Sequence, residues 1–151
     1  MWRIAKASDD EQICEMCLAL YVEDPSPLTV SDGNIRETLE ILRAAPVRGR
    51  AVVLELERGI GGYALLISFW SNELGGEVIV IDELYVRPSF RNQGHARELL
   101  TSVRHANRLW PERAVALELE VTPQNRRAAA FYEKVGFQPA KNARLRVMVQ
   151  Y

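Results

Sequence analysis

The sequence is poor in the residues that bind transition metals and form disulfides, with two cysteines and two histidines among 151 residues. Cys14 and Cys17 form a C-x-x-C pair, but a zinc site needs two more ligands. His95 and His105 lie far along the chain and have no paired spacing. Cys17 also shares the apolar stripe of a predicted helix, which consists of Ile13, Met16, Cys17 and Leu20. We therefore interpret Cys17 as a core residue and expect no metal; a redox or metal role for the pair is the alternative.

The sequence also lacks an excess of either charge and any long apolar run. Its 19 basic and 20 acidic residues leave a net charge of −1, so no overall field attracts nucleic acid or an anionic membrane. No run reaches the length of a membrane span, and residues 1–4 lead straight into predicted structure instead of a signal peptide. We expect a soluble, cytoplasmic protein that binds neither nucleic acid nor membrane. A chain of this length, 48% hydrophobic, suits one domain over residues 1–151.

Hydrophobic periodicity predicts an α/β fold with a mixed β-sheet flanked by helices on both faces. Strands are expected over residues 2–6, 51–57, 62–70, 77–86, 114–121, 137–139 and 144–151. A first helix follows the apparent capping box at Ser8 and ends before a loop at 22–30. A second begins after Ser31 and ends before Pro46, and a third carries its inner face from Ala96 to Asn107 and stops before Pro111.

Residues 86–96 combine an apolar strand end, a turn that contains glycine and a helix start. The first N–H groups of a helix have no intrahelical partner and carry partial positive charge, so this arrangement binds phosphate. Gly94 and Ala96 leave room for a ligand, and Arg91 adds a permanent charge. Neither the P-loop pattern nor the dinucleotide-binding glycine pattern is present.

Residues 122–137 predict a helix with clear ends. Thr122 can cap it, Pro123 suits its first position and Gly136 suits a left-handed stop. Four residues recur at helical spacing and predict a buried face: Ala128, Phe131, Tyr132 and Val135. A buried tyrosine needs a polar partner for its hydroxyl, which makes Tyr132 a candidate functional residue.

These two segments resemble the signatures of the GNAT superfamily of N-acetyltransferases. Arg91-x-x-Gly94-x-Ala96 matches [QR]-x-x-G-x-[GA], and residues 125–137 match N-x-x-A-x-x-F-Y-x-x-x-G-F. The resemblance implies the acyl-CoA N-acyltransferase fold, with a splay between the fourth and fifth strands, and acetyl-CoA as cosubstrate. The implied coenzyme-binding residues are Leu84, Tyr85, Val86, Arg91, Asn92, Gln93, Gly94, His95, Ala96, Arg97, Asn125 and Phe131. For Asn125 a helix-start role is the alternative, and for Arg97 it is an exposed surface charge.

The resemblance also implies catalytic roles. Tyr132 is the candidate acid that protonates the leaving thiolate, and Glu83 is the candidate base, acting through water. Electrostatic attraction of the substrate or a structural salt bridge is the alternative for Glu83. Its neighbour Asp82 is the alternative candidate for the base. Asp82 points to the other face if the strand is regular, and a bulge would change that assignment.

The expected reaction is transfer of an acetyl group to a primary amine of a small, cationic acceptor. The run I-D-E-L-Y-V resembles the polyamine acetyltransferase-like branch, and acidic residues that could surround the splay favour a cation: Glu23, Asp24, Glu73, Asp82, Glu83, Glu118 and Glu120. An aminoglycoside, an amino acid or a protein N-terminus remains an alternative acceptor. A non-catalytic acyl-CoA sensor is the alternative function, and the resemblance suggests a homodimer.

Overall fold

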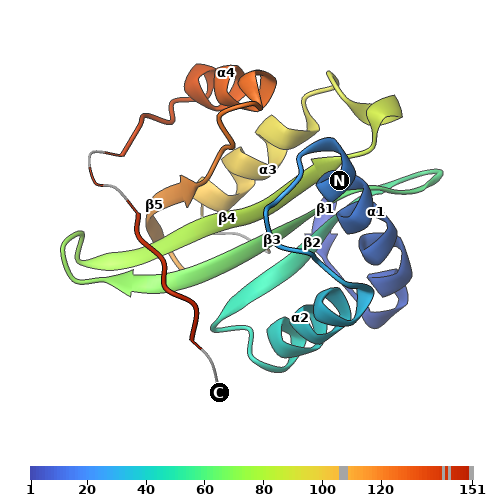
Figure 1. The fold of residues 1–151 in the computed structure, drawn as a ribbon, viewed down its shortest axis with the longest axis horizontal. Coiled ribbons are helices and arrows are strands. Elements are labelled where there is room, and N and C mark those ends of the chain that lie inside the picture. Colours follow the sequence, from blue (N-terminus) through green and yellow to red (C-terminus); the bar gives the residue numbers. More distant parts are fainter. Residues whose placement is uncertain (106–108, 141, 143, 150–151) are drawn as a thin grey trace. The chain divides into compact units, whose positions relative to one another are not determined.

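The computed structural model describes residues 1–105, 109–140, 142 and 144–149. Its contacts divide the chain into two units, Met1–Glu120 and Val121–Tyr151, which are described separately. The first unit contains a five-stranded sheet in the order β1-β2-β3-β4-β5 (Figure 1). The strands are β1 (Trp2–Ile4), β2 (Gly49–Leu56), β3 (Gly59–Ser71), β4 (Gly76–Val86) and β5 (Ala114–Leu119). The first four run antiparallel to their neighbours, whereas β4 and β5 are parallel.

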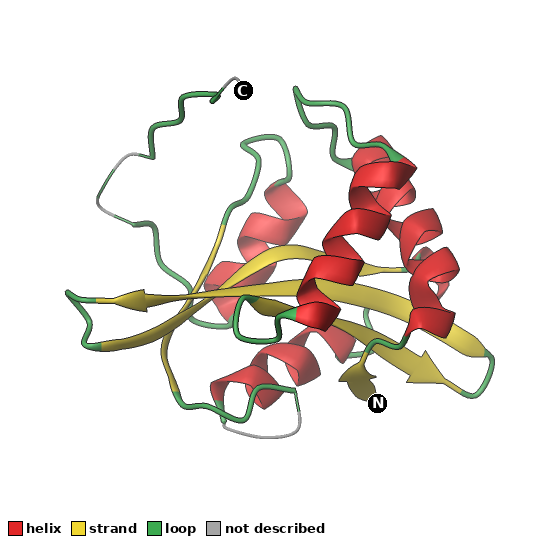
Figure 2. Cartoon of the chain, turned by 90° about the horizontal axis from the view of Figure 1, so that it is seen from below, coloured by secondary structure: helices red, strands yellow, loops and turns green. Residues whose placement is uncertain are grey.

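Helices cover both faces of this sheet, as predicted. Helices α1 (Asp10–Glu23) and α2 (Asp32–Ala44) lie on one face, and α3 (His95–Arg104) lies on the other (Figure 2). Helix α3 makes the crossover that a parallel β4–β5 pair requires. The mixed sheet with helices on both sides is the predicted fold class.

Successive residues of a strand point to opposite faces of the sheet, and in the central strands both sets of side chains are apolar. On the face of α1 and α2, Val53, Tyr63 and Leu65 belong to one buried cluster with the helical side chains Ile13 and Leu39. The intervening strand residues point to the other face and are equally buried, as are the α3 residues that cover them: Val52, Leu54, Ala64, Leu66, Leu99, Leu100 and Val103. Cys17 is 1% exposed in the first cluster, which confirms its prediction as a core residue.

The start of α1 corrects the predicted capping box at Ser8. Residues Ala7–Asp9 form a short 3-10 helix, and α1 begins at Asp10 without a side-chain cap. The Asp9 carboxylate instead accepts hydrogen bonds from Arg3 Nη1 at 2.7 Å and from the Lys6 N–H at 2.8 Å. The guanidinium of Arg3 binds this carboxylate more strongly than neutral helix N–H groups would. The capping-box pattern does not include a residue at the position of Arg3.

Of two other predicted helix ends in the first unit, one is confirmed and one is wrong. The Ser31 hydroxyl accepts from the Asn34 N–H at 3.2 Å, which confirms Ser31 as the cap of α2. Helix α3, by contrast, ends at Arg104, well before Pro111. Asn107, the last residue of its predicted inner face, lies outside the described residues.

The second unit contains α4 (Arg126–Lys134), which begins later than predicted. Asn125 caps it in place of Thr122, because Asn125 Oδ1 accepts from the Ala128 N–H at 3.1 Å. Pro123 therefore precedes the helix, and the N–H of Asn125 donates to the Thr122 carbonyl at 3.0 Å in a turn. The predicted stop at Gly136 is confirmed, since its φ is 99° and its N–H donates to the Glu133 carbonyl.

The two last predicted strands do not form among the described residues. Residues 137–139 and 144–149 have no regular secondary structure, and residues 150–151 lie outside the described part of the chain. Leu145, Val147 and Val149 alternate as in a half-buried strand, yet they are 93%, 85% and 68% exposed. A strand needs a neighbour for its backbone hydrogen bonds, and alternation in one segment does not specify that neighbour.

No helix within the described residues is both long and apolar enough to cross a membrane.

The Arg3–Asp9 ion pair predicts a pH-dependent contribution to stability. The hydrogen bond from Arg3 holds the pKa of Asp9 below its ordinary value. Asp9 therefore stabilises the fold above the unfolded pKa of about 3.9, and this contribution disappears as the pH falls through the lower, folded pKa. We expect Asp9→Asn to lower the free energy of unfolding at pH 7 by about 2 kcal/mol, and the difference from the wild type to shrink at acid pH.

Urea denaturation across pH measures both effects. Glu55→Gln is the matched control, because Glu55 is the exposed second partner of Arg3 at 3.0 Å. It should cost less than about 1 kcal/mol. Equal losses for the two variants at neutral pH would contradict the importance given to Asp9.

Candidate active site

Strand β4 continues well beyond the end of its parallel partner. The pairing with β5 stops at Ile81 opposite Leu119, whereas β4 runs on to Val86. On its other side β4 stays paired with β3 as far as Val86. The edge of β4 over residues 82–86 is thus not covered by β5, which is consistent with the predicted splay between the fourth and fifth strands.

A β-bulge in β4 decides which face receives each acidic residue. Leu66 of β3 pairs with Ile81, and the preceding Leu65 pairs with Glu83, so Asp82 is the extra residue. In a regular strand Glu83 would share the face of Ile81, towards α3. The bulge moves Glu83 to the face of Leu65, α1 and α2, and leaves Asp82 exposed.

The carboxylate of Glu83 is half-buried and accepts three hydrogen bonds. The Tyr21 hydroxyl donates to Oε1 at 2.8 Å, and the Tyr63 hydroxyl donates to Oε2 at 2.7 Å. The Cys17 thiol lies 3.5 Å from Oε2. A carboxylate taken out of water needs such donors, and here they come from α1 and β3.

The three donors keep their protons over the physiological pH range. Burial raises the pKa of Cys17 to about 12. Burial also raises the pKa of Tyr63 and of Tyr21, and the nearby negative charge of Glu83 raises both further. Each group is therefore a neutral donor to Glu83.

Helix α1 is tied to the uncovered part of β4 and to the following turn by further polar contacts. Arg87 donates to both carboxylate oxygens of Glu15 at 3.0 Å. Near the C-terminus of the helix, Glu23 accepts from Arg91 Nη2 at 2.9 Å and from the Tyr85 hydroxyl at 3.3 Å. The face of α1 towards the end of β4 thus carries ion pairs and hydrogen bonds.

The turn after β4 has the backbone geometry expected of a phosphate-binding helix start. Gly94 precedes α3 with a left-handed φ of 85°, and Asn92 has a φ of 63°. The Glu98 N–H makes the first helical hydrogen bond, to the Gly94 carbonyl at 2.9 Å, so the N–H groups just before Glu98 have no intrahelical acceptor. A Cβ at Gly94 would meet no protein atom within 4 Å. These features fit a pyrophosphate.

Two side chains of this turn, Arg91 and Gln93, make contacts within the protein. Arg91 donates through Nε to the Val86 carbonyl at 2.6 Å, besides its contact with Glu23, and lies over the Tyr85 ring at 5.2 Å. Its charge is therefore engaged with β4 and α1. Gln93 donates to the Ser89 carbonyl at 3.2 Å.

Three further residues predicted to bind the coenzyme lie in the first turn of α3: His95, Ala96 and Arg97. Arg97 is exposed and Ala96 half-buried. The His95 ring packs beside Glu98, with Nδ1 at 3.7 Å from Oε2, and its buried Nε2 has no hydrogen-bond partner among the described residues. The Trp2 indole donates to the His95 carbonyl at 2.9 Å, which ties the start of α3 to β1.

In the second unit, Tyr132 lies between two aromatic rings. Its ring centroid is 5.2 Å from that of Phe131 and 5.5 Å from that of Phe137. Burial raises the pKa of Tyr132 to about 12. The predicted buried face of α4 is half-buried throughout, and the Asn125 side chain has the helix-start role that was its alternative.

Not all predicted acidic residues lie near the end of β4. Glu73 lies in the turn that joins β3 to β4, at the opposite end of β4 from Glu83. Glu23 does lie near it, but as the last residue of α1, where it pairs with Arg91. On β5, Glu118 pairs with Val80, before the point where the two strands part.

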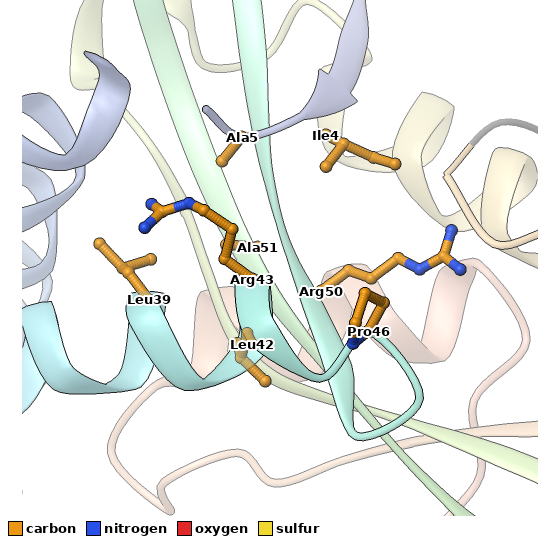
Figure 3. A pocket seen from close by; sticks show the side chains of 8 residues that line it. All are labelled: Ile4, Ala5, Leu39, Leu42, Arg43, Pro46, Arg50 and Ala51. Carbon is orange, nitrogen blue, oxygen red and sulfur yellow. The ribbon is translucent and has the colours of Figure 1, made fainter. Parts of the chain in front are cut away.

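A cavity of about 260 Å³ lies elsewhere, between α2 and the edge of β2 (Figure 3). Its walls are apolar except for Arg43 and Arg50, whose head groups turn in opposite directions (Figure 3). Arg43 binds Asp10 at 2.6 Å, and Arg50 lies over the Trp110 ring at 5.1 Å. The side chains of both arginines are directed to these partners, and none of the predicted site residues lines this cavity.

Sequence reasoning identified Glu83 but missed its partners Tyr21 and Tyr63. One signal was available, because Tyr21 follows Cys17 by one helical turn on the apolar stripe of α1. Tyr63 lies two strand residues before Leu65 and so shares its face. The bulge that directs Glu83 towards them has no signal in the sequence.

The fold and the helix start define a protein of the acyl-CoA N-acyltransferase class. A family model described as the acetyltransferase (GNAT) family matches residues 15–137. The chain therefore belongs to the GNAT acetyltransferase family and is an acetyl-CoA-dependent N-acetyltransferase, as the two motifs indicated. No curated protein matches the sequence.

Solved structures share the fold at low sequence identity. A possible acetyltransferase from Clostridium difficile 630 superposes with a TM-score of 0.83 at 18% identity, over 100% of this chain and 98% of that one. A predicted acetyltransferase with acetyl-CoA from Clostridium acetobutylicum gives 0.74 at 17% identity, over 98% and 95%. The ribosomal-protein-alanine N-acetyltransferase from Brucella melitensis gives 0.71 at 17% identity, over 99% of each chain.

Proposed function

We propose that this protein acetylates a primary amine of a small, cationic, polyamine-like acceptor, with Glu83 as the base and Tyr132 as the acid. The observation that carries the proposal is the half-buried Glu83 carboxylate on β4, the strand that leads into the phosphate-binding start of α3. One continuous segment thus offers an anion for the amine and a helix start for the coenzyme. We further propose that residues 1–151 act as one catalytic domain.

The uncovered edge of β4 and the following turn supply the proposed coenzyme site. Residues 84–86 would bind the pantetheine arm along the strand, and residues 91–97 the pyrophosphate, mainly through backbone N–H groups. Asn125 and Phe131 complete the proposed set by family resemblance. Acetyl-CoA, when bound, supplies the reactive acetyl thioester.

The first proton transfer of the reaction is removal of a proton from the acceptor amine, and we assign it to Glu83. An alkylamine has a pKa near that of lysine, about 10.4, and is protonated at neutral pH. Glu83 would take this proton, either directly or through a water molecule, so that the nitrogen lone pair can form the new C–N bond. Asp82, exposed on the bulge beside it, would help to attract the cation.

The second proton transfer is protonation of the leaving thiolate, and we assign it to Tyr132. When the C–S bond breaks, the thiolate needs a proton, and the Tyr132 phenol would give its own. The phenolate then takes up the proton that the acetylated nitrogen loses. In total the ammonium loses two protons, of which one reaches the thiol of free coenzyme A and the other reaches solvent through Glu83.

The negative charge of Glu83 and Asp82 favours a cationic acceptor, and the I-D-E-L-Y-V run favours a polyamine-like one. An aminoglycoside, an amino acid and a protein N-terminus are the alternative acceptors. That the protein is a cytoplasmic homodimer stays a prediction from the sequence.

The acceptor prediction is tested by thiol release from acetyl-CoA with a panel of polyamines, aminoglycosides, amino acids and peptides. We expect the highest kcat/KM with a polyamine. A preference for another amine would show that the acceptor belongs to a different class, without contradicting acetyl transfer from acetyl-CoA. Tight acetyl-CoA binding without release of thiol for any acceptor would favour the sensor function.

The coenzyme site is tested by adding bulk at Gly94. Gly94→Leu should weaken acetyl-CoA binding at least about tenfold, because the side chain would enter the open space in front of the helix start. Gly75→Leu is the matched control, since Gly75 also has a left-handed φ, of 65°, and an equally open surrounding. Calorimetry on both variants separates backbone strain from loss of the site. Unchanged affinity in Gly94→Leu would place the coenzyme elsewhere.

The role of Tyr132 is tested by Tyr132→Phe, which keeps the ring contacts and removes the acid. We expect kcat to fall on the order of 100-fold while the acetyl-CoA dissociation constant changes less than about twofold. Because burial raises the pKa of Tyr132 to about 12, the phenol keeps its proton at lower pH, and kcat of the wild type should not decline between pH 8 and 10. A Tyr132→Phe variant with normal turnover would remove Tyr132 from the mechanism.

A further inference from the structure

The hydrogen bonds of Glu83 leave its two oxygens unequal. Oε2 accepts from both Tyr63 and Cys17, whereas Oε1 accepts from Tyr21 alone. A carboxylate offers about four lone-pair positions, two on each oxygen. The one position not occupied by these donors is therefore on Oε1, beside the Tyr21 hydroxyl.

We propose that Tyr63 and Cys17 position Glu83 so that only Oε1 serves the acceptor, and that Tyr21 is a specificity-determining residue that binds the same ammonium group. This inference rests on the proposed role of Glu83 as base. It assigns the acceptor nitrogen to a site between Glu83 Oε1 and the Tyr21 phenolic oxygen. Both atoms accept N–H donors from a primary ammonium.

Tyr63 has the properties of a positioning residue. It is 0% exposed and comes from the centre of the sheet, where β3 is paired on both sides. Its hydroxyl therefore reaches Glu83 from the core and does not face the acceptor. A hydrogen bond from a fixed, buried donor to a charged oxygen restricts the carboxylate to one orientation.

Tyr21 has different surroundings. It is half-buried, and it lies near the C-terminus of α1, two residues before Glu23. While its hydroxyl donates to Glu83, its oxygen can still accept a hydrogen bond. An ammonium group at this point would contact a carboxylate oxygen and a phenolic oxygen at once, which favours a donor with at least two N–H groups.

The two tyrosines should thus affect different kinetic constants. With the acceptor found in the panel, Tyr63→Phe should lower kcat about tenfold and change the KM for acceptor less than about twofold. Tyr21→Phe should raise that KM about tenfold and change kcat less than about threefold. A loss of stability alone would not separate the constants in this way.

A double-mutant cycle shows whether Tyr63 acts through Glu83. Glu83→Gln alone should lower kcat on the order of 100-fold. In the Glu83→Gln background, Tyr63→Phe should have no further effect, because the group that it positions is already lost. Additive losses in the double variant would overturn the inference.

The chain offers a matched pair of cysteines as a control for packing. Cys14 and Cys17 are 2% and 1% exposed in the same apolar cluster, about one helical turn apart, and only Cys17 contacts Glu83. Both alanine variants remove a buried sulfur. Cys17→Ala should lower kcat about threefold and Cys17→Ser should restore it, whereas Cys14→Ala should leave kcat unchanged. Equal effects of the two alanine variants would show that packing alone is involved.

A crystal structure of the Tyr63→Phe variant tests the positioning without turnover. We expect Glu83 to leave its orientation towards β3, while calorimetry shows unchanged acetyl-CoA affinity. If no acceptor is acetylated, the proposed function fails, and this structure still decides whether Tyr63 positions Glu83. A Glu83 side chain found unmoved in the variant would overturn the positioning role.

Discussion

The candidate site depends on one extra residue in β4. Without the bulge at Asp82, Glu83 would point to the face of α3, where Leu66 and Leu99 are both 0% exposed. A carboxylate there would lose its hydration without gaining donors, at a cost of several kcal/mol. The bulge turns Glu83 to the opposite face, where two hydroxyls and a thiol receive it. The same local change stops the regular alternation where β4 loses its partner β5.

The polar contacts around this carboxylate explain why α1 matters to the site. A purely apolar helix face could cover the sheet but could not hold a charge. Tyr21 and Cys17 supply donors to Glu83, and Glu15 and Glu23 pair with arginines that follow β4. Helix α1 is thus attached to both the acceptor side and the coenzyme side of the proposed site. Any movement of its last turns would be felt at Glu83 and at Arg91 together.

The sequence predicted the parts of the site that depend on local order. The turn at Gly94 and the start of α3 follow from a short motif, because backbone geometry over a few residues determines them, whereas the splay of β4 was implied by the family resemblance. The fold class followed in the same way from periodicity. The Arg3–Asp9 pair and the missing last strands were not predicted, and the cap at Asn125 was predicted only as an alternative role. Each depends on competition between neighbours, or on a partner remote in sequence, that periodicity does not encode.

The two halves of the proposed reaction therefore differ in how far sequence alone can specify them. Binding of a diphosphate needs backbone N–H groups in one turn, so a motif of a few residues is enough to indicate the coenzyme. In the proposed site, recognition of the acceptor depends on side chains from α1, β3 and β4 around one carboxylate, and the register of β4 is set by a bulge. A one-residue slip in β4 would leave the phosphate-binding turn intact and remove Glu83 from its donors. In this proposal the choice of acceptor depends on tertiary contacts, so variants at Tyr21 and Tyr63 test it more directly than variants in the motif.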